Sequence, residues 1–385
     1  MRAKLSATLL VALLVGCSGA AARPITGTGV VKSLAALAQR TQAQIPGALP
    51  PSFHPVYADG YRGWPVWPLH AQHPIRGSFL DPRGIDENGL AGYHFGIDVN
   101  VNDLQPEPGA PTGLSHRVYA MEGGAARIVH GTRYACANRR LEVGHFSYWH
   151  VAPTVPPGAA VRAGTPIGWT CLGEWHVHVS EWQLVGGKRV WVNPLLPSGK
   201  FAPYIDTEPP IVSGMRFVTP PRTRWDPDTS LRGLDNAATL APQHLHGLVE
   251  LRAQIEDAQS FWGFLARNPG YETPHHPYRV GVEIRARSGK VVLQRISFQS
   301  DQLPVTPYLV HYAPGTVQNG SMDECLHAPR GGSCPGTDWF RPFSRYRQEF
   351  WNTRAVPNGR YGVTVVAWDL KGRAGSLTVP VVVAN

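Results

Sequence analysis

Short apolar runs separated by glycine and proline dominate most of the chain. Between residues 59 and 204 such runs recur at 97–101, 118–121, 126–129, 141–143, 146–151 and 166–169. Runs of this length bounded by turn residues are typical of β-strands, and this region has no long stretch with the 3.6-residue period of a helix. We therefore expect an antiparallel β-sheet domain over 59–204.

The C-terminal half alternates apolar and polar residues more regularly. Alternation is clear at 249–255, 280–284 and 361–368, and a turn at Lys371-Gly372-Arg373 precedes a last apolar run at 377–383. Pro209 and Pro210 separate this half from the first domain, because consecutive prolines stop a strand and stiffen a connection. We expect a second domain over 205–385 that is similar, at the level of the fold, to an immunoglobulin-like or fibronectin-like β-sandwich. The fold class is then mostly β.

The N-terminus has the pattern of an export signal. Arg2 and Lys4 precede an apolar run at 9–15 that is too short to cross a bilayer. The sequence Leu14-Val15-Gly16-Cys17 resembles the lipobox of bacterial lipoproteins, which implies a signal over 1–17 and lipid attachment at Cys17. An ordinary signal peptide cut near Ala20-Ala21-Ala22 is the alternative. We expect an extracytoplasmic protein anchored to a bacterial membrane, periplasmic or cell-surface, with 18–58 as a tether that contains a short helix near 30–43.

Charge and cysteine usage fit an exported protein. The net charge of +9 suits work beside anionic polymers such as membrane headgroups or peptidoglycan carboxylates, whereas the scattered basic residues do not support nucleic-acid binding. With Cys17 set aside for lipid, an even number of cysteines remains, which predicts two disulfides among Cys136, Cys171, Cys325 and Cys334. Proximity favours Cys325 with Cys334 and Cys136 with Cys171, but four cysteines permit three pairings. A zinc–thiolate site is the rival interpretation, and no CxxC spacing supports it.

Three histidine-containing segments carry the candidate chemistry. They are His94-Phe95-Gly96-Ile97-Asp98, Tyr148-Trp149-His150-Val151 and His176-Val177-His178. Side chains alternate along a strand, so His176 and His178 emerge on one face and are close enough to share a site. In a straight strand His94 and Asp98 would lie roughly 13 Å apart, so both can reach one ion only if the chain bends at Gly96. Two imidazoles and one carboxylate with an open fourth position suit a catalytic zinc ion.

The order and spacing of these segments resemble the lysostaphin or LytM type of peptidoglycan metalloendopeptidase. The likeness covers about 67–194 and includes HxxxD, a middle YxH, the terminal HxH, Ser78-Phe79, Val118-Tyr119-Ala120 and the run 161–168. It implies a lysostaphin-like peptidase fold with a duplicated hybrid motif and Zn²⁺ as cofactor. It also implies His94, Asp98 and His178 as zinc ligands, with His150 and His176 as the catalytic histidines that exchange protons and stabilise the tetrahedral oxyanion.

The flanks of the HxH segment depart from the family. The residues before it read Cys171-Leu172-Gly173-Glu174-Trp175 rather than a turn rich in threonine and glycine, which puts substrate preference in doubt. Glu174 is either an additional acid or base or a solvated loop carboxylate. His145 is a rival to His150 for the middle role, because the segment between them is shorter than the usual hairpin.

We expect a zinc metalloendopeptidase that cuts peptide cross-links or stem peptides of peptidoglycan. A non-catalytic cell-wall binding or activator lipoprotein on the same scaffold is the alternative, and a zinc peptidase acting on proteins is a third. The retained ligand set His94, Asp98 and His178 favours catalysis over a degenerate scaffold.

Overall fold

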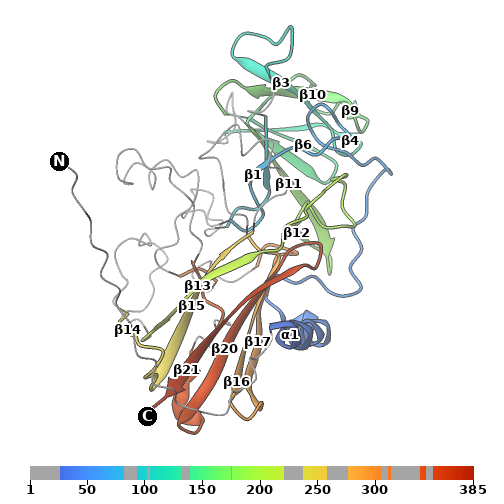
Figure 1. Cartoon of the computed structure of the whole chain (residues 1–385). Coiled ribbons are helices and arrows are strands. Elements are labelled where there is room, and N and C mark those ends of the chain that lie inside the picture. The colour runs from blue at the N-terminus through green and yellow to red at the C-terminus, as the bar shows by residue number, and fades with distance from the viewer. Residues whose placement is uncertain are drawn as a thin grey trace, which may run out of the picture.

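The structure is a computed structural model, and the protein it describes is mostly β. It describes residues 27–81, 93–101, 105–131, 139–174, 176–220, 237–257, 276–304, 311–313, 339–343 and 350–385. Figure 1 shows two β regions one above the other, with the helix α1 beside the lower one. The named strands all pair in antiparallel fashion, as the hydrophobic pattern predicts.

The first region is built around one large sheet. Its strands are β1 (Ile75–Gly77), β2 (Ile97–Asn100), β5 (Arg127–His130), β6 (Arg139–Val143), β7 (Phe146–Trp149), β11 (His176–Val185) and β12 (Lys188–Val192). They follow the spatial order β1-β2-β11-β7-β6-β5, and β12 pairs with the second half of β11. A smaller sheet has the order β3-β10-β8, with β3 at Leu114–Tyr119, β8 at Val151–Pro153 and β10 at Pro166–Cys171, and β4 (Gly124–Ala125) pairs with β9 (Ala160–Val161).

One face of the large sheet forms the core, and the other carries the polar chemistry. Val177 and Val179 of β11 are completely buried in the core. Because side chains alternate along a strand, the neighbouring His176, His178 and Ser180 emerge on the opposite face. The alternation in the HVHVS segment therefore positions two histidines side by side.

The second region consists of two sheets. One has the order β14-β13-β15-β18 with β19 also on β15, and the other has the order β17-β16-β20-β21. The bounds are Ile211–Val218 for β13, Thr239–Leu240 for β14, Leu248–Glu256 for β15, Arg279–Ala286 for β16, Val291–Gln299 for β17, Trp339–Phe340 for β18, Trp351–Asn352 for β19, Gly359–Trp368 for β20 and Ala374–Val383 for β21. Tyr361 donates from its hydroxyl to the Pro357 carbonyl 2.6 Å away, a contact that resembles the tyrosine corner of immunoglobulin-like sandwiches.

Residues 27–58 do not form the tether that the sequence predicts. The helix α1 (Gly27–Thr41) packs on the β17-β16-β20-β21 sheet, and Val30, Leu34 and Ala38 are buried there against Ile296 and Trp368. The weak amphipathic pattern is a real apolar stripe at four-residue spacing, which a packed helix needs and a tether does not. The segment after α1 is also held, because the backbone N–H of Leu49 donates to Asp301. The signal, Cys17 and residues 18–26 lie outside the described residues.

Helix packing also explains the burial of β20. Every residue from Tyr361 to Trp368 is buried, although the sequence alternates. Val363 and Val365 face the sandwich core, whereas Val366 and Trp368 face α1. The strand therefore has two covered faces, which an antiparallel sheet often lacks.

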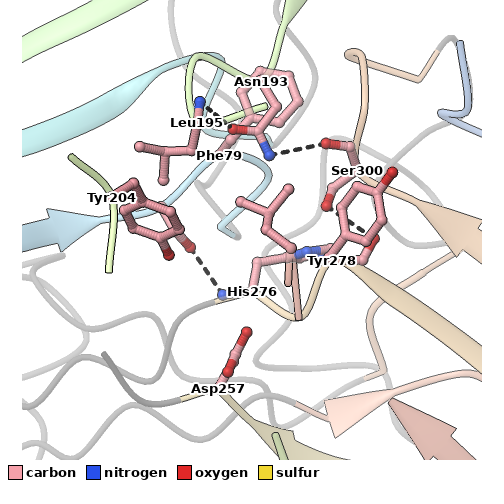
Figure 2. A pocket seen from close by; sticks show the side chains of 10 residues that line it. Phe79, Asn193, Leu195, Tyr204, Asp257, His276, Tyr278 and Ser300 are labelled. Carbon is pink, nitrogen blue, oxygen red and sulfur yellow. Dashed lines mark hydrogen bonds between the residues drawn. The ribbon is translucent and has the colours of Figure 1, made fainter. Parts of the chain in front are cut away.

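The two regions meet at a junction that also holds a small pocket. Phe79 and Leu195 line it from the first region, and His276, Tyr278 and Ser300 line it from the second (Figure 2). The amide of Asn193 donates to the Ser300 carbonyl at 3.0 Å, and the N–H of His276 donates to Ser78 Oγ at 2.8 Å. Within the part of the chain that is described, no helix is long and apolar enough to span a membrane.

Candidate metal centre

Three side chains from two segments converge on the polar face of the large sheet. Asp98 lies on β2 and His178 on β11, and the two residues are directly paired across the strands. His94 precedes β2 by three residues. All three residues are buried, with exposed fractions of 4%, 6% and 6% for His94, Asp98 and His178. Within the described residues, these three form the group whose ligand atoms lie close enough to hold one metal ion.

The three ligand atoms form a compact triangle. His94 Nε2 lies 2.7 Å from His178 Nδ1 and 3.1 Å from Asp98 Oδ1, and His178 Nδ1 lies 3.0 Å from the same oxygen. Ligand atoms of a tetrahedral zinc ion, bound at about 2.0–2.1 Å, are roughly 3.3 Å apart. The observed triangle is therefore a few tenths of an ångström tighter than a zinc site and has the right shape for one.

Hydrogen bonds behind the histidines are compatible with the tautomers that a metal ion needs. His94 Nδ1 lies 2.8 Å from the Ser78 carbonyl, which can only accept, so Nδ1 carries the proton and a neutral His94 turns its Nε2 lone pair toward the triangle. His178 Nε2 lies 2.7 Å from Ser180 Oγ, which can accept from an Nε2–H and so leave the Nδ1 lone pair facing the same point. Such outer contacts orient metal-binding histidines. Lone pairs and a carboxylate pointing at one another repel unless a cation lies between them, so the residues fit a metal ion.

Gly96 permits the close approach of the two ligand segments. The chain bends at Gly96, immediately before β2, as the sequence requires for His94 and Asp98 to reach one point. A Cβ at this position would lie 2.5 Å from the Val179 carbonyl oxygen and 2.7 Å from His178 Nε2. Any larger residue would therefore push β2 away from β11 and open the triangle.

Burial and the neighbouring charges keep the ligands in their metal-binding protonation states. Burial lowers the pKa of His178 to about 3, so the imidazole is neutral at neutral pH. Burial alone would raise the pKa of Asp98, but His94 and His176 in their protonated forms, together with hydrogen bonds from His178 and His94, outweigh it and hold the pKa well below its usual range. A metal ion binds neutral imidazole and ionised carboxylate, which are the forms that these shifts favour for His178 and Asp98.

The structure brings His150 and His176 to the same site. Their ring centroids are 4.5 Å apart, and His176 Nε2 lies 3.5 Å from Asp98 Oδ1. His176 Nδ1 donates to the Glu174 carbonyl at 2.5 Å, which leaves Nε2 facing the metal-ligand triangle. Burial lowers the pKa of His176 to about 4, and the nearby Arg76 acts in the same direction.

His150 interrupts the expected strand. The run 146–151 divides into β7 and β8, and His150 between them has a φ of 62°, in the left-handed region that non-glycine residues seldom adopt. This break turns the His150 side chain toward His176. Backbone strain of this kind is concentrated at functional sites.

Glu174 lies against His150 in a turn and is partly exposed to solvent. Its Oε2 is 3.0 Å from His150 Nδ1, an ion-pair distance, although the nitrogen is not aligned for a hydrogen bond. The interaction with His150 lowers the pKa of Glu174. The carboxylate is therefore placed to orient His150 rather than to contact the metal-ligand triangle.

The rival for the middle role lies elsewhere. His145 is at the opposite end of β7, with Nδ1 2.8 Å from Glu122 Oε2 and its ring against Trp182, so His150 is the middle histidine of the site. Glu181 lies on the core side of β11, where it accepts from the Tyr57 hydroxyl at 2.7 Å and burial raises its pKa to about 7. The alternation of β11 thus separates Glu181 from the metal-ligand face.

Of the predicted disulfide cysteines, Cys171 ends β10 and is disulfide-bonded. Cys136, Cys325 and Cys334 lie outside the described residues, so the pairing remains a prediction.

Three groups at the site have weak or no sequence signals. Ser180 contacts His178, and its position two residues later on the same strand face could have identified it. Ser78 acts through its backbone carbonyl, for which side-chain identity gives no signal. Arg76 Nη1 lies 3.3 Å from His176 Nδ1 through tertiary packing alone.

Comparison with known proteins adds no family assignment, since no family model and no curated protein matches the chain.

Proposed function

We propose that this protein is a zinc-dependent endopeptidase that hydrolyses peptide bonds in peptidoglycan cross-links or stem peptides. The observation that carries the proposal is the triangle of His94, Asp98 and His178, whose ligand atoms converge within 2.7–3.1 Å. Two further histidines lie at its edge, and a structural zinc site would instead fill all four positions with protein ligands.

His94, Asp98 and His178 would hold the ion. Zinc bound there supplies Lewis-acid polarisation of a peptide carbonyl and activation of water at neutral pH. The bend at Gly96 and the contacts from Ser78 and Ser180 fix the ligand geometry before any metal arrives. This preorganisation favours a mononuclear site with one open position.

His150 and His176 have the positions needed for proton transfer. The Nδ1–H of His176 is engaged by the Glu174 carbonyl, so its Nε2 can accept a proton at the edge of the triangle. Glu174 holds His150 from behind, which fits a group that donates to the developing oxyanion or the leaving amine. General acid–base groups of this kind contribute about 10²–10⁴-fold to rate.

The proposal extends to location. The export pattern and the lipobox-like sequence around Cys17 support an enzyme outside the cytoplasm on a lipid anchor, with peptidoglycan as its partner. The positive net charge suits an anionic polymer as substrate.

A non-catalytic wall-binding or activator lipoprotein is the second candidate. The resemblance of the second region to immunoglobulin-like sandwiches is compatible with it, because such domains commonly bind partners. The complete ligand triangle with two adjacent histidines favours catalysis.

The deciding experiment measures zinc content and peptidoglycan solubilisation for the mature wild type, His178→Ala and His150→Ala. We expect about one zinc per wild-type chain and release of wall peptides. We expect His178→Ala to lose both, and His150→Ala to keep zinc while losing activity. A wild type that binds zinc and cleaves neither wall nor wall peptides would overturn the peptidase proposal and favour the binding protein.

A further inference from the structure

Three arginines gather around one carboxylate on the polar face of the large sheet. Glu142, on β6, is buried, and its carboxylate oxygens lie 2.6 Å from Arg127 Nη1, 2.9 Å from Arg140 Nη2 and 3.6 Å from Arg189 Nη2. The arginines come from β5, β6 and β12. We call this group the three-arginine cluster.

The cluster has more positive charge than its own carboxylate can balance. One carboxylate facing three guanidinium groups leaves two positive charges uncompensated. Arg140 reflects this imbalance, because burial and the repulsion of Arg127 and Arg189 lower its pKa despite Glu142. Its Nε is buried and has no hydrogen-bond partner. A second anion bound at the cluster would relieve this repulsion.

The cluster remains open to solvent. The side chains of Arg127 and Arg189 are 65% and 42% exposed, so two of the three guanidinium groups can reach a ligand. The buried carboxylate of Glu142 lies close to both guanidinium groups.

Strand register places the cluster on the same face as the metal-ligand triangle. Glu142 pairs with Ser147 on β7, Ser147 pairs with Ser180 on β11, and Ser180 follows His178 by two residues. The Ser147 hydroxyl donates to Glu142 at 3.3 Å, and Ser180 contacts His178. Two strand spacings of about 4.8 Å and a two-residue offset put the Cα atoms of Glu142 and His178 roughly 12 Å apart.

The side chain of Trp149 lies between the metal-ligand triangle and the three-arginine cluster. Trp149 has its ring 6.0 Å from the His178 ring and 4.7 Å from the Arg140 guanidinium. The guanidinium of Arg189 stacks over Trp182 at 4.4 Å and lies 5.1 Å from Trp191. These stacking contacts hold the guanidinium planes in place, which favours recognition of a planar anion over loose charge attraction.

We propose that the three-arginine cluster is a substrate subsite that binds a free carboxylate of the peptide cut at the metal centre. The inference rests on the proposed function and narrows its substrate to acidic peptides. An extended chain rises about 3.3 Å per residue, so the bound carboxylate lies three to four residues from the cleaved bond. A planar carboxylate fits the paired N–H donors of a guanidinium.

The test measures binding by the zinc-depleted full chain, so that it does not depend on catalysis. The probe is a soluble mixture of peptidoglycan stem-peptide fragments, either untreated or with its carboxyl groups converted to methylamides, titrated by tryptophan fluorescence. The variant is Arg127→Gln with Arg189→Gln. The matched control is Arg162→Gln with Arg287→Gln, which removes the same charge from exposed positions away from the cluster.

We expect the cluster variant to bind the untreated fragments at least about 10-fold more weakly than wild type. The control variant should bind them as wild type does, and amidation should weaken wild-type binding to the level of the cluster variant. Equal losses of affinity in the two variants would show that only net charge matters and would overturn the subsite. Wild-type binding that is equally tight with untreated and amidated fragments would overturn it as well.

The zinc-loaded protein separates this inference from the proposed function. Cleavage that is equally fast on untreated and amidated fragments would overturn the subsite and leave the peptidase intact. Carboxylate-dependent binding without cleavage would overturn the peptidase proposal and keep the subsite. The protein would then be one that binds acidic peptides. If inorganic phosphate displaced the fragments completely at equal concentration, the site would be one for phosphate and the carboxylate assignment would be wrong.

Discussion

Both halves of the molecule contain a pair of buried histidines, and only one pair is suited to hold a metal. In the first region, burial lowers the pKa of His178 to about 3 and of His176 to about 4. In the second, burial lowers the pKa of both His276 and His311 to about 3. A neutral buried imidazole is therefore common to both places and does not define a site.

The difference lies in what surrounds the rings. His276 packs edge-on against Phe340, and His311 packs edge-on against Phe298. The charged groups that act on the pKa values there are His311 for His276 and Arg341 for His311. In the first region Asp98 also acts, and it raises the pKa of both His176 and His178 against the effect of burial. A convergent carboxylate, rather than the histidines themselves, separates a candidate metal centre from an aromatic core.

Removing that carboxylate should have the largest effect. Asp98→Ala deletes one of three ligands. Structural zinc sites with four ligands bind the ion with a free energy of about 10–16 kcal/mol, so each ligand accounts for roughly 3 kcal/mol. We expect zinc affinity to fall by at least about 100-fold. Metal titration with a competing chelator measures it. His276→Phe is the control and should bind zinc as wild type does; a comparable loss in that variant would refute the distinction between the two pairs.

The aromatic pair should instead govern acid stability. The pKa of His276 and His311 is about 3 in the folded protein and near 6.5 when unfolded, so the unfolded state binds more protons between these values. Their contribution is present above pH 6.5 and is lost as the pH falls toward 3. Each should reduce the free energy of unfolding by about 1.4 kcal/mol per pH unit.

His276→Phe keeps an aromatic ring at this position and removes one titratable group. In urea unfolding of the zinc-free protein between pH 6.5 and 4.5, wild type should lose about 1.4 kcal/mol more per pH unit than the variant. Parallel pH profiles would show that His276 is protonated in the folded state, contrary to its lowered pKa.

Ser180 tests the outer support of the metal-ligand triangle. Ser180→Ala removes the contact at 2.7 Å to His178 Nε2, and loss of such a contact reduces metal affinity by about 10–100-fold. The zinc dissociation constant should rise by that factor while the fold is retained. Ser147→Ala is the matched control, because Ser147 lies on the same face and contacts Glu142 rather than a ligand. Equal affinities of the two variants would exclude a supporting role for Ser180.

Glu174 should give the smallest change. Glu174→Gln removes the charge beside His150 and leaves all three metal ligands in place. We expect zinc content to be unchanged and kcat for wall peptides to fall by about 10-fold, less than the 10²–10⁴-fold that a general acid or base itself contributes, because Glu174 only orients His150. KM should stay constant. A rise in KM with constant kcat would instead assign Glu174 to substrate binding.

The strands and the main site residues were predictable because their signals are local. Alternation of apolar and polar residues identifies strands such as β15 and β20, and the HVH alternation places His176 and His178 together. The need for a bend at Gly96 follows from the reach of His94 and Asp98, and the structure confirms it.

The features that the sequence did not reveal depend on contacts between distant residues. The apolar stripe of α1 is too weak to distinguish a packed helix from a tether until its partner sheet is known. The break at His150 requires a positive φ, and no glycine next to it in the sequence indicates that conformation. Arg127, Arg140 and Arg189 are spread over three strands and become a cluster only through the sheet order.

The docking of α1 constrains the sequence of events during biosynthesis. The helix begins at Gly27, but the surface that receives it includes Trp368, near the other end of the chain. Contacts this distant in sequence form last, because the intervening chain must be made and ordered first. While the polypeptide emerges, the stripe of Val30 and Leu34 has no native partner, so it is the segment most exposed to chaperones and to premature aggregation.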